Sequence, residues 1–309
     1  VEIRVISGDN PATVSSIAKQ AGIKEYGKYV DCRELESYED IKKAVKKYTV
    51  FGRVNPEQKK QIIKALKELG LKVAMTGDGV NDILAMKESD CSIAMGSGAD
   101  VARETAQVVL LDSDFGNMRD IVYEGRKNIN NITRSASLFT YKNIFSLLLS
   151  IYSIVFAMQY PLEPNQVSLG SAFTIGIPAF LLTFEENQKK QQNGDFLRKV
   201  FTDSLPAAIT SFLAIVAMVG FSILFNVGEQ EITTACSYLF FTGGFLILYK
   251  IIRPLNKYRV SVMALCILGI LLTINIMPNF FAIKEISGRA TALVTLFAIA
   301  EFALIRWIT

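Results

Sequence analysis

The chain has 309 residues, of which 50% are hydrophobic and 20% charged, and its formal net charge is +4. A charge this small does not favour nucleic acid as a partner. The absence of histidine excludes a His-ligated zinc site and a histidine base. The four cysteines are far apart and form no CxxC pair, which indicates reduced packing residues.

The first residues form a strand-like run from Val1 to Ile6, without an initial methionine or the features of a signal peptide. We therefore expect the chain to be part of a longer polypeptide.

Residues 1–116 alternate short apolar runs with helix-compatible segments. The apolar runs predict strands at 1–6, 28–30, 48–51, 72–75, 91–95 and 108–111. The segments between them predict helices at 12–21, 39–47, 56–69, 82–89 and 101–106. Strands that alternate with helices imply a parallel sheet covered on both faces, so the predicted fold class of this part is α/β, Rossmann-like.

Residues 117–135 are polar, helix-compatible and free of proline, so we expect one long stalk helix that continues into the first apolar run. Six apolar runs follow at roughly 136–158, 166–184, 205–226, 234–252, 260–277 and 289–308. Each is close to the ~20 residues that a helix needs to cross a bilayer. Residues 136–309 are therefore predicted to form an all-α six-helix transmembrane bundle.

Charge in the loops predicts the orientation of these spans. Positive side chains of the second-to-third and fourth-to-fifth loops are Lys189, Lys190, Arg198, Lys199, Lys250, Arg253, Lys257 and Arg259. The loops 159–165 and 227–233 contain no Lys or Arg, whereas the last outer loop contains Lys284 and Arg289. The positive-inside rule then predicts that the soluble part and the C-terminus are cytoplasmic.

Two acidic loops that contain glycine follow predicted strands, Ser7-Gly8-Asp9 and residues 76–82. Ligands of an open parallel sheet gather at the carboxyl ends of its strands. Asp78 and Asp82 supply hard oxygen ligands that suit Mg²⁺, and Ser7 with the N–H groups after it suits phosphate oxygens. Lys59, on helix 56–69, would offset phosphoryl charge. A lone GDG is more often a turn and a lone lysine a solvated residue, but together they favour a magnesium–phosphate site.

Four segments resemble motifs of one known family. They are SGDN (7–10), FGRVNPEQK (51–59), TGDGVND (76–82) and IAMGSGADVARETAQVVLLDSDF (93–115). The chain resembles the C-terminal part of a P-type (E1–E2) cation-transporting ATPase. The resemblance implies that residues 1–116 are part of the cytoplasmic phosphorylation domain, which has the haloacid dehalogenase-like fold. It also implies that residues 136–309 are the last six transmembrane helices.

The resemblance further implies ATP as substrate and Mg²⁺ as cofactor. Catalytic roles are implied for Lys59, Asp78 and Asp82, with Asp78 and Asp82 as the metal ligands. Phosphate or nucleotide contacts are implied for Ser7, Gly8, Asp9, Arg53, Lys59 and Asn81. The family's DKTGT motif, which carries the nucleophilic aspartate, does not occur in the chain. We therefore expect the chain alone to be inactive and to need the missing N-terminal part of the same polypeptide.

In this family, the transported cation binds between membrane spans that include counterparts of the first two spans here. At the positions where calcium pumps have acidic residues, this chain has Ser146 and Ile175. The candidate transport residues are therefore neutral: Asn143, Ser146, Ser171 and Thr174. Helix packing by small polar residues explains them equally well. Gly176 and Pro178 would break the second span and free backbone carbonyls as ligands.

The leading interpretation is an ATP-driven cation pump of the bacterial plasma membrane, with calcium as one candidate cargo. Three alternatives stay open. The first is a lipid flippase or polyamine-type carrier of the same family, the second a membrane-tethered phosphatase with the same soluble fold, and the third a non-catalytic scaffold.

Overall fold

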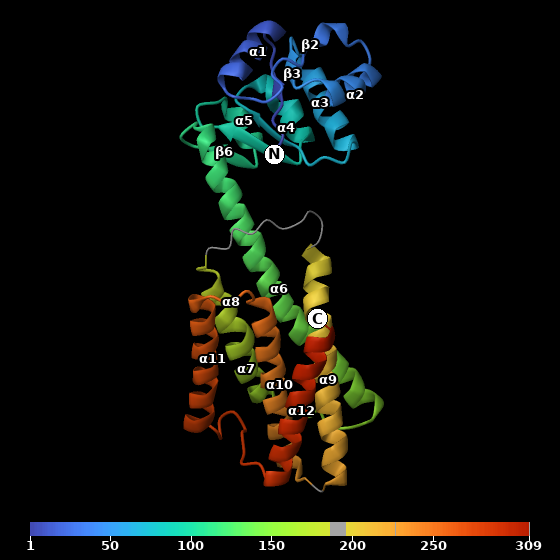
Figure 1. Ribbon diagram of the computed structural model, residues 1–309, viewed down its shortest axis with the longest axis vertical. Helices are drawn as coiled ribbons and strands as arrows, with labels where there is room; N and C mark the ends of the chain where they lie inside the picture. The colour runs from blue at the N-terminus through green and yellow to red at the C-terminus, as the bar shows by residue number, and fades with distance from the viewer. Residues whose placement is uncertain (186–195, 226, 309) are drawn as a thin grey trace. The chain divides into compact units, whose positions relative to one another are not determined.

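A computed structural model describes residues 1–185, 196–225 and 227–308 of the chain (Figure 1). The chain forms two compact units, Val1–Arg119 and Asp120–Thr309. Lys189 and Lys190, which contribute to the predicted loop charge, lie outside the described residues.

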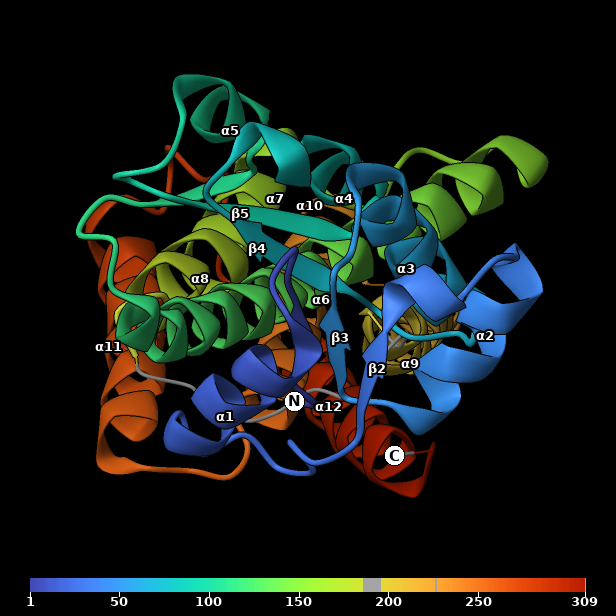
Figure 2. The same cartoon turned by 90° about the horizontal axis from the view of Figure 1, so that it is seen from above.

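The first unit contains two three-stranded sheets rather than the single predicted sheet. In the first, the order is β1 (Val5–Ile6), β3 (Val50–Gly52) and β2 (Tyr29–Asp31). In the second, it is β4 (Ala74–Gly77), β5 (Cys91–Met95) and β6 (Val108–Leu110). Every pairing is parallel, as predicted, and Figure 2 shows β2 beside β3 and β4 beside β5. The described residues place β1 and β4 at sheet edges, since each pairs with a single strand.

Helices join these strands in the predicted order. They are α1 (Pro11–Gln20), α2 (Tyr38–Lys47), α3 (Pro56–Glu68), α4 (Ile83–Glu88) and α5 (Asp100–Thr105), with the 3₁₀ turns η1 (Cys32–Glu34), η2 (Val80–Asp82) and η3 (Phe115–Asn117). Asn55 starts α3, because its side chain accepts from Gln58 N–H while the Gln58 side chain accepts from Asn55 N–H. Such a capping box fixes the first turn of a helix, which is the turn that carries Lys59.

Consecutive isoleucines of α3 enter two apolar clusters. Ile62 packs with Phe51 of β3, whereas Ile63 packs with Met75 of β4. Ile6 of β1 contacts both clusters, so the edge strand β1 lies against the cluster that contains Met75. Cys32 is buried in the first cluster, and burial raises the pKa of its thiol to about 12, which fits the packing role predicted for it.

The second unit is helical. Its elements are α6 (Met118–Val155), α7 (Pro164–Ser171), η4 (Ala172–Gly176), α8 (Ile177–Leu182), α9 (Phe196–Leu224), α10 (Glu229–Ile251), α11 (Lys257–Ile276) and α12 (Gly288–Ile308). Among the described residues, six spans are long and apolar enough to cross a membrane, which confirms the predicted number. The chain is a multi-pass membrane protein.

Two of the membrane-spanning segments are not simple α-helices of about 20 residues. Helix α6 is continuous over 38 residues, or about 57 Å at 1.5 Å per residue. The second span is not one regular helix, because the π-helical segment η4 separates α7 from α8. Gly176 and Pro178 therefore accompany a π-helix and not the predicted break. Helices α9, α10 and α12 pack on one another in the bundle (Figure 1).

Candidate functional site

The segment after β3 holds the loop after β1 through its backbone. Val54 N–H donates to Ser7 O at 3.0 Å, and Arg53 N–H donates to Asp9 O at 2.8 Å. Ser7 Oγ accepts from Asp9 N–H and donates to Asp9 Oδ2, both at 3.2 Å. Gly8 and Asp9 are exposed at the carboxyl end of β1. The structure thus brings three of the predicted phosphate-binding residues, Ser7, Asp9 and Arg53, into one loop cluster.

Lys59 and Asp82 form an ion pair that is largely withdrawn from water. Lys59 Nζ lies 2.6 Å from Asp82 Oδ1, and each side chain is 11% exposed. Asp82 ends the turn η2 that follows β4, and its Oδ2 accepts from Gly79 N–H at 3.4 Å. A Cβ at Gly77 would overlap the Asp82 side chain, so this close approach requires glycine. The first turn of α3 and the β4 loop are joined by this pair.

Asp78 occupies a different environment from Asp82. Its side chain is exposed, and within the described residues its carboxylate makes no hydrogen bond or ion pair. Its backbone is fixed, since its carbonyl accepts from Ala99 N–H at 2.8 Å and a Cβ at Gly98 would collide with it. Asn81 is also exposed.

These donors fit Mg²⁺ in part. The described residues contain no group of three or more His, Cys, Asp or Glu that could hold a metal alone. Mg²⁺ keeps several waters and usually takes one or two carboxylates together with substrate phosphates. The free carboxylate of Asp78 matches this requirement. Asp82 is less available, because Lys59 occupies its Oδ1.

Sequence reasoning missed Asp31, which holds Arg53. Arg53 has a positive φ of 54°, and its Nε lies 3.8 Å from Asp31 Oδ2. A non-glycine residue in this region stores strain, which is frequent at functional sites. The hydrogen bond from Arg33 lowers the pKa of Asp31, and the charge of Arg53 adds to this effect. The available signal was that Asp31 ends a strand at the same carboxyl edge as Ser7.

The four candidate transport residues differ in burial. Asn143 is exposed, Ser146 and Ser171 are half-buried, and Thr174 in η4 is buried. Ser171 Oγ donates to Val167 O at 2.6 Å, and Thr174 Oγ1 donates to Gly170 O at 2.7 Å. Both hydroxyls are therefore bonded back to their own helix. In the described residues, no hydrogen bond joins any two of the four side chains.

Comparison with known proteins finds similarity over most of the chain. Residues 1–90 match the family of haloacid dehalogenase-like hydrolases. The chain is 40% identical over 93% of its length to "Probable cation-transporting ATPase exp7" of Streptococcus pneumoniae. It is 34% identical over 99% of its length to "Calcium-transporting ATPase CtpE" of Mycolicibacterium smegmatis, and 31% identical over 77% to a "Calcium-transporting ATPase" of Bacillus subtilis.

The chain belongs with the P-type cation-transporting ATPases. It covers 38%, 40% and 28% of the lengths of these three relatives. The activity of the whole protein is therefore taken up below as a proposal.

Two buried glutamates of this P-type ATPase chain were not among the predicted site residues. Glu301 lies in the last span and is 0% exposed. Its signal was an acidic residue within an otherwise apolar run, which is costly in a bilayer. Glu185, after α8, is the buried acceptor for Arg134 of α6 and Arg259 of α11.

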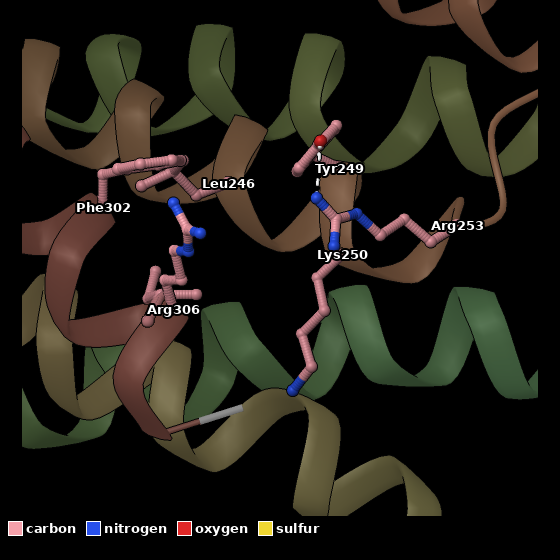
Figure 3. Close-up of a pocket in the computed structure, with 7 residues that line it drawn as sticks. Leu246, Tyr249, Lys250, Arg253, Phe302 and Arg306 are labelled. Carbon is pink, nitrogen blue, oxygen red and sulfur yellow. Dashed lines mark hydrogen bonds between the residues drawn. The ribbon is translucent and has the colours of Figure 1, made fainter.

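A basic cavity of about 340 Å³ lies between the C-terminal parts of α10 and α12 (Figure 3). Its lining residues are Leu246, Tyr249, Lys250, Arg253, Phe302, Ile305 and Arg306. Arg253 donates to Tyr249 Oη at 2.6 Å, and Lys250 pairs with Asp203 of α9 at 3.4 Å. Figure 3 shows Arg306 directed into the cavity toward Leu246, and among the described residues it has no ion-pair partner.

Proposed function

We propose that the chain is the phosphate-handling and membrane part of an ATP-driven cation pump that works through an aspartyl phosphate. The observation that carries the proposal is the Lys59–Asp82 pair next to the free carboxylate of Asp78, in a chain that also has six membrane spans. A soluble phosphatase would need the first feature and not the second.

The chain's own residues have separate tasks in this proposal. Asp78 would hold Mg²⁺, with Asn81 beside it, and the bound ion would neutralise charge on the transferred phosphoryl group. Lys59 fixes Asp82 and brings a positive charge to the carboxyl end of β4, where negative charge develops. Gly8 N–H would donate to phosphate oxygens, as would the Ser7 hydroxyl once it turns away from Asp9 Oδ2. Asp9 holds Arg53 in the same cluster through its carbonyl, and Arg53 would add positive charge there.

The sheet edges support a partner segment that lies outside this chain. Strands β1 and β4 each pair on one side only within the described residues, and Ile6 of β1 packs on the cluster that contains Met75 of β4. Unpaired edges are normally covered or paired. A further parallel strand between β1 and β4 would join the two sheets and would end beside Asp78. We infer that this strand belongs to the N-terminal part of the polypeptide and carries the nucleophilic aspartate.

The cargo is proposed to be a cation, with calcium as the first candidate, because relatives are named as calcium-transporting. Asn143, Ser146, Ser171 and Thr174 remain the candidate ligands in the chain. A π-helix such as η4 is frequent at functional sites, and Pro178 leaves a carbonyl of the preceding turn without its helical donor. Loop charge supports a cytoplasmic location of the first unit. The bacterial relatives support the plasma membrane of a bacterium as its location.

The first experiment tests the phosphate site in the intact protein. Asp78→Asn should abolish Mg²⁺-dependent transfer of label from the γ-phosphate of ATP to protein, because the amide removes the charge that holds the metal. Lys59→Met should lower the labelling strongly. Asp112→Asn, at an exposed position of the same unit, is the matched control. Wild-type labelling by Asp78→Asn would refute the metal assignment.

The second experiment separates the candidate functions. ATP hydrolysis by the intact protein in liposomes should be stimulated by one cation among calcium, magnesium, manganese and potassium. Stimulation by lipid or polyamine and by no cation would favour the carrier alternative. Hydrolysis of small phosphate esters without a phosphoenzyme from ATP would favour the phosphatase.

A further inference from the structure

Three helices of the membrane unit contribute to one buried polar cluster. Glu301 of α12 accepts a hydrogen bond from Ser211 Oγ of α9, and Ser211 Oγ lies 3.0 Å from Tyr141 Oη of α6. The exposed fractions are 0% for Tyr141, 1% for Ser211 and 0% for Glu301. We call these three residues the Glu301 cluster. It lies within apolar surroundings that include Leu138 and Phe145 on the adjacent turns of α6.

Glu301 has no neutralising cation in the part of the chain that the structure describes. Among the described residues, no Lys or Arg lies within ion-pair distance of it, and its Oε2 has no hydrogen-bond partner. The nearest charged residues along the helices around it are Lys142, next to Tyr141 on α6, Asp203 on α9, which pairs with Lys250, and the three basic side chains of the cavity. A buried carboxylate without a partner is costly in the membrane, whereas a protonated carboxyl is not. The free Oε2 is the atom on which the proton would sit.

Two consecutive glycines bring α10 against this cluster and against η4. A Cβ at Gly243 would collide with the hydroxyls of Ser211 and Tyr141 and with Glu301 Oε1. A Cβ at Gly244 would collide with Thr174, the buried candidate transport residue. The Glu301 cluster and Thr174 are therefore on adjoining faces of α10, one residue apart along its backbone. A displacement of α10 at one of these faces would therefore also change the packing at the other.

The basic cavity brings open space close to the cluster. Leu246 follows Gly243 by three residues on α10, and Ile305 follows Glu301 by four residues on α12. Residues at these spacings are neighbours on one helix face, so both lie one helical turn from the cluster. Leu246 and Ile305 also line the cavity, whose volume of about 340 Å³ has room for several waters (Figure 3). Water in the cavity would reach to within one turn of Glu301.

We propose that the Glu301 cluster is a proton-binding site in the membrane unit, and that this cavity is the route by which water reaches it. Hydronium in the cavity forms an O–H bond on Oε2 and leaves a water, and release reverses this step. Ser211 donates to Oε1 in both states. A divalent cation fits poorly, because it needs six or more oxygens and the cluster offers one carboxyl and two hydroxyls. The proposal rests on the membrane unit alone and does not depend on pump activity.

The first test uses the carboxyl chemistry of the intact protein in detergent. Dicyclohexylcarbodiimide reacts with protonated carboxyl groups in apolar surroundings. Mass spectrometry should find the label on Glu301, with labelling that decreases as the pH rises, whereas the ion-paired Glu185 should stay unlabelled. Infrared difference spectra should contain a carboxylic-acid band that is lost in Glu301→Gln. Absence of both the label and the band would overturn the proposal, as would protection from the label by divalent cations at constant pH.

The second test uses glycines as a matched pair. Gly243→Ala should displace the cluster and change the pH at which labelling is half-lost, because the added Cβ enters the space of all three oxygens. Gly220→Ala on α9 is the control, since a Cβ there meets nothing within 4 Å. Leu246→Trp, which fills the cavity, should slow deuterium exchange of the carboxyl band. Unchanged exchange in Leu246→Trp would refute the route, and an equal effect of both glycine variants would refute the site.

Discussion

Glu185 and Glu301 are both buried acids of the membrane unit, but their partners differ in charge. Glu185 accepts from Arg259 Nε at 2.8 Å, from Arg134 Nη1 at 2.9 Å and from Asn256 Nδ2 at 2.6 Å. Glu301 accepts from one hydroxyl, that of Ser211, and its second oxygen has no partner among the described residues. The first glutamate is surrounded by donors that require it to be charged, and the second by groups that do not.

This difference separates a structural acid from a candidate functional one. Burial of a charge is tolerated when it is paired and hydrogen-bonded, and removal of one partner then leaves an uncompensated charge. Glu185 ties α6 to α11 in this way, because its two arginines come from those helices. An unpaired membrane acid has no such stabilising role, so its presence points to function.

The largest expected effect follows from Glu185→Gln. The amide leaves Arg134 and Arg259 buried without a counter-charge, so the free energy of unfolding of the intact protein should fall by about 3–5 kcal/mol. Denaturant or thermal unfolding in detergent measures it. Glu25→Gln is the control, because its ion pair with Lys28 is exposed and should contribute below about 0.5 kcal/mol. If Glu185→Gln destabilised the protein as little as the control, Glu185 would not be a structural acid and its contrast with Glu301 would fail.

A smaller decrease in the free energy of unfolding is expected for Arg134→Met. Glu185 then keeps Arg259 and Asn256, and Arg259 is further held because its Nη1 donates to Ile252 O at 2.9 Å and to Pro254 O at 2.6 Å. One charged hydrogen bond is removed, so unfolding should become easier by about 1.5–3 kcal/mol. The same unfolding assay applies. In Glu185→Gln, adding Arg134→Met should have the opposite sign or no effect, since it removes an unpaired charge.

Local sequence patterns predicted the order of strands and helices in the first unit, but not its division into two sheets. Strand runs, the cap at Asn55 and the acidic loops are read from neighbouring residues, and the order of strands and helices followed from them. Asp82 and Lys59 were each recognised from their motifs. Their direct pairing was not predicted, because it depends on how closely the β4 loop approaches α3. Gly77 permits that approach, since a Cβ there would collide with the Asp82 side chain.

The membrane unit was predicted in outline and not in its contacts. Six apolar runs are enough to count the membrane spans, but they do not show which helix faces contact one another. Tyr141 and Glu301 are 160 positions apart, and no spacing rule joins them. Comparison of two spans with calcium pumps drew attention to Asn143 and Ser146, whereas the buried acid lies on the last helix. The π-helical geometry of η4 likewise depends on packing that the sequence does not display.

The contribution of Glu185 to stability should be lost at acid pH, which would distinguish it from Glu301. Burial alone would raise the pKa of Glu185, but hydrogen bonds from Arg259, Asn256 and Arg134 outweigh it and lower the pKa below its ordinary 4.5. Its contribution to stability is therefore complete above pH 4.5 and is lost as the pH falls through the lowered value. Unfolding temperatures measured along an acid series should drop in the wild type more than in Glu185→Gln. Parallel curves for the two proteins would contradict this assignment.

The smallest effect on stability is expected for Glu301→Gln. The amide keeps the shape of the protonated carboxyl and can still accept from Ser211, and no buried cation loses its partner. The free energy of unfolding should therefore change by no more than about 1 kcal/mol, although Glu301 is as deeply buried as any residue of the bundle. If Glu301→Gln instead destabilises the protein as much as Glu185→Gln, Glu301 is ionised and paired in the folded state. The contrast between the two acids, and the proton site inferred from it, would then be wrong.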